Sequence, residues 1–119
     1  MKKLLQLEDW AVFLLSILIF SQLPFAWWVF PALILLPDLG MVGYLVSPKV
    51  GAWTYNFIHH RAVAAAAGAL GIWLGDPNWL LISVILFGHI SMDRALGYGL
   101  KHEDSFANTH LGKINFGKQ

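Results

Sequence analysis

The chain has 119 residues, of which 57% are hydrophobic and 13% are charged, and its formal net charge is +1. Soluble domains carry about 25% charged residues, so this composition predicts a single-domain integral membrane protein in a lipid bilayer. No run of Lys or Arg is longer than Lys2-Lys3, which argues against a nucleic-acid partner. The absence of cysteine excludes disulfides and thiolate-ligated metals, and leaves His, Asp and Glu as strong metal ligands.

The N-terminal segment has a basic start and a long apolar stretch. This superficially suits a signal peptide, but Glu8 and Asp9 interrupt the apolar run and no small-x-small cleavage site follows it. We therefore expect an uncleaved first helix over residues 4–23, which Pro24 ends. At about 1.5 Å per residue this helix is about 30 Å long, enough to cross the hydrocarbon core of a bilayer.

Three further apolar segments predict three more helices. They cover residues 25–46, 52–74 and 79–98. The second contains Pro31 and Pro37, each of which removes one backbone hydrogen bond. The predicted fold class is all-α, a four-transmembrane-helix bundle over residues 1–119 that ends in a short polar tail over 101–119.

The positions of the lysines predict the topology of this bundle. They lie at the start, between the second and third helices, and in the tail: Lys2, Lys3, Lys49, Lys101, Lys113 and Lys118. The other two connections contain no Lys or Arg. Because positive charge is retained on the cytoplasmic side, we expect a multi-pass protein of the cell membrane with both termini in the cytoplasm.

Every predicted helix carries an ionisable side chain at a similar depth, about 6 to 14 Å below the cytoplasmic surface at 1.5 Å per residue. These side chains are Glu8, Asp38, His59, His89 and Asp93. His89 and Asp93 are four residues apart and share a helix face. Each unpaired ion would cost about 2.5 to 3.5 kcal/mol inside a membrane, so the carboxylates need a partner. The sequence predicts one shared polar site.

Two kinds of partner would compensate these carboxylates. The first is a divalent metal ion such as zinc, iron or manganese, bound by all five side chains in the way that helix bundles build carboxylate and histidine sites. The second is an ion pair between Asp38 or Asp93 and a nearby arginine, Arg61 or Arg94, with the histidines neutral. The sequence leaves both open.

The metal hypothesis predicts an enzyme, because a bound metal acts as a Lewis acid or activates water. In a hydrolase, Glu8 or Asp38 is the candidate general base, and Arg94 is the candidate for holding the phosphate or carboxylate head group of a lipid-like substrate. With iron, an oxidative reaction on a lipid is the corresponding expectation. The alternatives are an ion or proton transport protein that works as a homo-oligomer, and a structural membrane protein without catalysis.

Three further residues are candidates for supporting roles. Tyr55 lies four residues before His59 and is a candidate hydrogen-bond partner behind the ligands. His60 is adjacent to His59 and so points about 100° away from it, toward the interface. His110 would reach the site if residues 108–112 folded back over it.

Several motifs together resemble a domain-of-unknown-function family of small bacterial four-helix integral membrane proteins. They are Glu8, Pro37-Asp-Leu-Gly-Met-Val-Gly-Tyr44, Tyr55-Asn-Phe-Ile-His59, His89 with Asp93-Arg-Ala-Leu-Gly-Tyr-Gly-Leu-Lys101, and Thr109-His-Leu-Gly112. The resemblance covers nearly the whole chain and implies the four-helix membrane fold, but it implies no activity. His60 and the alanines after Arg61 depart from the family pattern.

A looser likeness concerns small membrane-bound metal-dependent hydrolases, which also place a histidine one turn before an aspartate in multi-span helices. Here only His89 and Asp93 correspond. This likeness is an analogy between patterns and implies no more than the possibility of metal chemistry.

Overall fold

The computed structural model describes residues 1–97, 108–109 and 112–113, and over residues 1–97 the predicted all-α class is confirmed. Its elements are the α-helices α1 (Lys2–Ser21), α2 (Val29–Leu33), α3 (Pro48–Ile58), α4 (Arg61–Leu74) and α5 (Pro77–Ala95), the 3₁₀ helix η1 (Leu36–Leu45), and the strands β1 (Asn108–Thr109) and β2 (Gly112–Lys113). The two strands pair antiparallel. Most of the predicted polar tail, including His110, lies outside the described residues.

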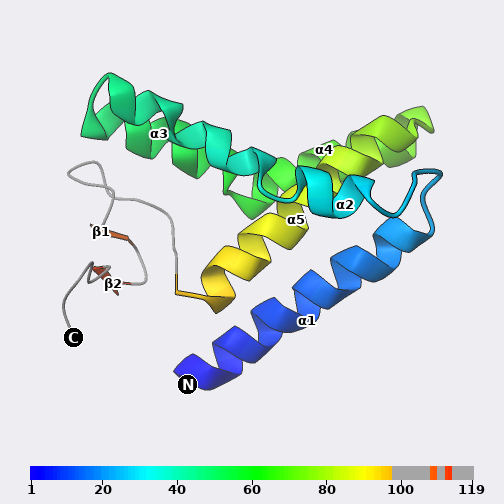
Figure 1. Cartoon of the computed structure of the whole chain (residues 1–119), viewed down its shortest axis with the longest axis horizontal. Coiled ribbons are helices and arrows are strands. Elements are labelled where there is room, and N and C mark those ends of the chain that lie inside the picture. The colour runs from blue at the N-terminus through cyan, green and yellow to red at the C-terminus, as the bar shows by residue number, and fades with distance from the viewer. Residues whose placement is uncertain (98–107, 110–111, 114–119) are drawn as a thin grey trace.

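Helix α5 is the central element of the structure. It packs against α1 on one side and against α4 on another, while η1 and α3 lie side by side (Figure 1). One core cluster joins Phe20 and Phe30 to Val84 and Ile85 of α5. A second cluster joins Ala64 of α4 to the next turns of α5. The buried face of α5 therefore holds the other elements around it.

The predicted helix over 25–46 is wrong as a single α-helix. It consists of the short helix α2 and the 3₁₀ helix η1. Proline has no backbone N–H and clashes with the preceding turn, so Pro37 ends the α-helical pattern and stands at the start of η1. The Thr54 hydroxyl of α3 donates to the Gly40 carbonyl at 2.6 Å and fastens η1 in place.

The predicted helix over 52–74 is likewise divided. It begins earlier, at Pro48, because the Ser47 hydroxyl caps α3 by accepting from the Val50 N–H at 3.1 Å. It breaks at His59 and His60, where α3 and α4 meet at 41°. His60 is extended and its Nδ1 accepts from the Ala62 N–H at 3.0 Å, so its side chain caps α4.

Within the described part of the chain, α1 alone is long and apolar enough to cross a membrane as one straight helix. The bent pair α3 and α4 passes the same test only as a broken span, and residues 29–45 form a shorter apolar segment. Only Ser16 and Phe20 of α1 are buried. The four-span bundle and the cytoplasmic position of the termini therefore stay predictions.

The close approach of α4 and α5 at Gly71 yields a test of this packing. A Cβ atom at Gly71 would lie 2.7 Å from Leu80 Cγ and 2.8 Å from the Leu80 backbone nitrogen. Gly71→Val should therefore force the helices apart and lower the free energy of unfolding by about 1–3 kcal/mol. Ala69→Val on the exposed face of α4 is the matched control. Thermal unfolding in detergent measures both, and equal midpoints would contradict this packing.

Candidate metal centre

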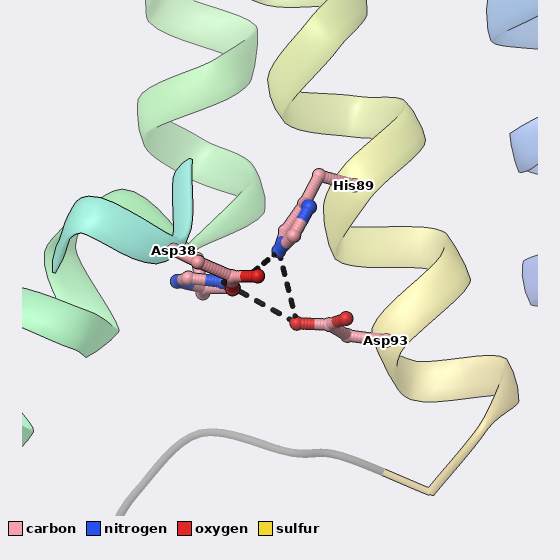
Figure 2. Close-up of side chains that lie close together, drawn as sticks. Asp38, His89 and Asp93 are labelled. Atoms are coloured by element: carbon pink, nitrogen blue, oxygen red, sulfur yellow. Dashed lines mark hydrogen bonds and ion pairs between the residues drawn. The ribbon is translucent and has the colours of Figure 1, made fainter. Parts of the chain in front are cut away.

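Four of the five predicted metal ligands converge between η1, the end of α3 and α5. They are Asp38, His59, His89 and Asp93, and one ligand atom from each lies within 4.8 Å of the others. Figure 2 shows His89 and Asp93 projecting from α5 toward Asp38. Among the described residues, the predicted shared site therefore contains both histidines and two of the three predicted carboxylates.

Regular helix geometry positions two of these side chains and interruptions position the other two. His89 and Asp93 lie one turn apart on α5. Asp38 lies in the first turn of η1, directly after the break at Pro37. His59 is the C-cap of α3, at the bend before α4. The breaks that divide the predicted helices thus each deliver one ligand.

The two imidazole rings share the same pair of carboxylate oxygens. His89 Nε2 lies 2.9 Å from Asp38 Oδ1 and 3.2 Å from Asp93 Oδ2. His59 Nε2 lies 3.5 Å and 3.3 Å from the same two atoms. Two nitrogens and two oxygens therefore surround one small space.

Backbone carbonyls determine which nitrogen of each ring carries a proton. His89 Nδ1 lies 2.5 Å from the Ile34 carbonyl oxygen, and His59 Nδ1 lies 2.9 Å from that of Tyr55. A carbonyl only accepts, so Nδ1 must be the donor in both rings. In a neutral ring, Nε2 then has a lone pair and no proton. Both lone pairs face the aspartates.

The Ile34 carbonyl is available because of Pro37. In a continuing helix it would accept from a backbone N–H three or four residues later. Pro37 has no N–H, and the Asp38 N–H donates instead to the Leu35 carbonyl at 3.1 Å. The break therefore leaves a free acceptor, which orients the His89 ring.

With neutral rings the cluster consists of acceptors that face one another. His59 Nε2 is buried and makes no hydrogen bond, although both carboxylates lie near it. The Tyr55 hydroxyl donates a hydrogen bond to Asp93 Oδ2 at 3.3 Å. This bond goes to a carboxylate oxygen and supplies no donor to the ring nitrogens. Buried acceptors without donors are costly, so the centre requires a cation or protonation of the rings.

The site is closed on one side and open on the other. The side chains of His89, His59 and Asp93 are 0%, 4% and 14% exposed. Asp38 is 44% exposed. Solvent or a small molecule therefore reaches the centre from the Asp38 side.

The remaining predicted residues lie elsewhere. Glu8 is exposed on α1 and is not part of the group of four. Its neighbour Asp9 instead forms an ion pair with Arg61, whose Nη2 also donates to the Ser91 hydroxyl at 3.4 Å. Arg94 Nη2 donates to the His59 carbonyl at 3.4 Å.

The predicted alternative, in which Arg61 or Arg94 neutralises Asp38 or Asp93, is therefore wrong. Among the described residues, both carboxylates pair with the two histidines, and Arg61 pairs with Asp9. The sequence reasoning missed the ion pair of Asp9. The sequence did contain a signal for this pair, because Asp9 and Arg61 are charged residues in two predicted membrane helices and each needed a partner.

The predicted hydrogen bonding of Tyr55 to the site residues is present. Besides its hydroxyl bond to Asp93 and its carbonyl bond to His59, its ring stacks on that of His59, with centroids 3.8 Å apart and planes 7° from parallel. His60 does not enter the centre, since it caps α4. One tyrosine therefore holds two of the four candidate ligands.

His59, His60 and His89 allow a test of this geometry that needs no ligand. We expect Nδ1 to carry a proton in His59 and His89, whereas Nδ1 of His60 accepts a hydrogen bond and must be bare. The ¹⁵N chemical shifts of the ring nitrogens distinguish these forms. Bare Nδ1 atoms in His59 and His89 would contradict the assignment.

Comparison with known proteins assigns the chain to a protein family but to no activity. A family model described as Domain of unknown function (DUF4260) matches residues 2–114. No curated protein and no solved structure matches the chain. The match includes all four residues of the candidate centre. The chain belongs to the DUF4260 family.

Proposed function

We propose that this protein binds one divalent metal ion through Asp38, His59, His89 and Asp93. The observation that carries the proposal is the orientation of the two rings, each anchored by an Nδ1–H bond to a backbone carbonyl with Nε2 turned inward. This is how metal-binding histidines are usually held, because the outer hydrogen bond selects the tautomer that leaves Nε2 free to bind. The buried, unpartnered Nε2 of His59 supports the same conclusion.

Charge balance also favours a metal ion. Two aspartates carry two negative charges, which one divalent cation neutralises while both rings stay neutral. Protonation of both rings would balance the charge as well, but it would place two buried cations side by side, since the centroids of His59 and His89 are 4.9 Å apart. Like charges at such a distance repel, and burial adds a desolvation penalty.

The donor set and its spacing fit a first-row metal. Nitrogen and oxygen donors suit zinc, iron and manganese. With ligand bonds of about 2.0–2.1 Å, neighbouring ligands of a tetrahedral site lie about 3.3 Å apart. The four N···O distances here, from 2.9 to 3.5 Å, surround that value, and all four ligand atoms lie within 4.8 Å of one another.

We further propose that the protein is a multi-pass protein of the cell membrane, with both termini and the centre near the cytoplasmic face. The apolar length of α1 supports this, as do its outward side chains, among which Leu7, Leu14 and Leu18 are each at least 60% exposed. An exposed apolar surface of this extent in water would be a liability, whereas lipid would cover it. The lysines near the predicted cytoplasmic ends support the orientation.

The arrangement is best suited to a metal-dependent enzyme with a lipid-like substrate. A metal bound here would supply a Lewis acid. Asp38 faces the opening and is placed to accept a proton from an incoming water. Arg94 follows Asp93 and, within the described residues, pairs with no carboxylate, so it is placed to bind a phosphate or carboxylate group.

Elemental analysis of the purified protein tests the metal proposal. We expect about one metal ion per chain in the wild type, and its loss in His59→Gln and His89→Gln, because each removes a ligand that Gln replaces poorly. The matched controls are Glu8→Gln, outside the group, and His60→Asn, which retains a cap for α4. Circular dichroism and gel filtration establish that the variants fold.

Two outcomes would contradict this proposal. If the wild type contains no stoichiometric metal and takes up none from zinc, manganese or ferrous salts, the centre is not a metal site. If the ligand variants all unfold while the controls do not, the cluster has a structural role. Proton-coupled flux through liposomes containing metal-free protein would instead favour transport by an oligomer.

The contact between Tyr55 and Asp93 gives a finer prediction. Tyr55→Phe removes a hydroxyl that orients a candidate ligand but leaves all four ligands in place. We expect unchanged stoichiometry and an affinity weaker by roughly 10- to 100-fold, the usual effect of removing such a contact. Trp53→Phe, at an exposed position of the same helix, is the control. Metal titration with a competing chelator measures both, and equal affinities would exclude this role.

A further inference from the structure

An apolar groove lies between α2, η1, the end of α3 and α5, and its volume is about 240 Å³. Its lining consists only of leucine, isoleucine, proline and glycine, among them Leu36, Pro37, Leu39, Ile58, Ile82 and Leu86. None of these side chains is polar. The groove therefore offers no hydrogen-bond partner from a side chain and suits a hydrocarbon.

The lining of the groove includes sequence neighbours of the candidate metal ligands, although none of the four ligands lines it. Pro37 directly precedes Asp38, and Ile58 directly precedes His59. Leu86 lies three residues before His89 and thus on the same side of α5. The groove and the charged cluster are therefore neighbours along η1, α3 and α5.

A single stripe of α5 connects the two regions. Ile82, Leu86, His89 and Asp93 follow at spacings of four, three and four residues and share one helix face. From Ile82 to His89 the stripe extends about 10 Å at 1.5 Å per residue. The groove is open at Ile82, a lining residue that is 45% exposed. Polarity thus rises from an exposed apolar entrance to a buried polar end.

We infer that the groove binds the single hydrocarbon chain of an amphiphilic molecule, whose polar end lies at the cluster of Asp38, His59, His89 and Asp93. The inference rests on the proposed metal centre for the role of that polar end. Ligand pockets commonly measure about 300–1,000 Å³, so a groove slightly below this range suits one narrow chain better than a folded peptide. The change from apolar to charged side chains along α5 determines which end of the bound molecule lies at the cluster.

A second apolar cavity makes an internal control. It lies between α1, α4 and α5, measures about 440 Å³, and includes Leu15, Gly68 and Leu80 in its lining. No residue of its lining is adjacent in sequence to a member of the cluster. If ordinary lipid fills any apolar hollow, this larger cavity should take up at least as much as the groove.

The test is photo-crosslinking in lipid nanodiscs with palmitate that carries a diazirine in its chain, followed by mass spectrometry of the peptides. We expect adducts to concentrate on residues 33–40 and 81–86 rather than on the lining of the second cavity. Ile82→Trp, at the open rim, should reduce this labelling several-fold by filling the entrance. Leu18→Trp on the exposed face of α1 is the matched control and should leave it unchanged.

The experiment distinguishes a failure of the groove inference from a failure of the metal proposal. Equal labelling of the two cavities would overturn the inference. So would groove labelling that Ile82→Trp and a second variant of an exposed lining residue, Leu36→Trp, both leave intact. Gel filtration confirms that each variant folds, and elemental analysis of the same samples reports the metal. Selective groove labelling in protein that takes up no metal would overturn the metal proposal and still support the chain site. Bound metal without selective labelling of the groove would overturn the groove inference and support the metal proposal.

Discussion

The rest of the structure depends on the need to compensate carboxylates that lie against buried histidines. Asp93 is largely enclosed by the fold, and its charge is met by no arginine or lysine among the described residues. The two rings that meet it are fixed by outer hydrogen bonds, so they cannot turn a donor inward without losing a carbonyl partner. A cation bound between them would resolve this conflict for all four side chains at once.

Irregular backbone is what brings these groups together. A bundle of straight helices would present Asp38 and His59 wherever the helical period put them. The proline at position 37 converts the chain to a tighter helix and releases the Ile34 carbonyl, and the bend before α4 makes His59 the end of a helix. These interruptions remove regular backbone hydrogen bonds, and carbonyl groups near them accept hydrogen bonds from the histidine rings of the site instead.

The same region joins a polar centre to an apolar groove, and this juxtaposition points to an amphiphile. Pro37 and Ile58 line the groove, and the next residue in each case is a candidate ligand. A ligand that spans both environments would match the change in polarity along α5. The extensive apolar surface of α1 is consistent with a setting in which such molecules are abundant.

Composition and helical period by themselves determined the helical class, and the common depth of the ionisable groups identified four of the residues that meet. Depth along a helix follows from counting residues, because the rise per residue is constant. Direction around the helix does not, and here Glu8 and Asp9 differ by about 100°. Only the tertiary structure decided that Glu8 faces outward while Asp9 pairs with Arg61. It also decided how the interrupted segments are held in place, since the Thr54 hydroxyl of α3 donates to the Gly40 carbonyl of η1.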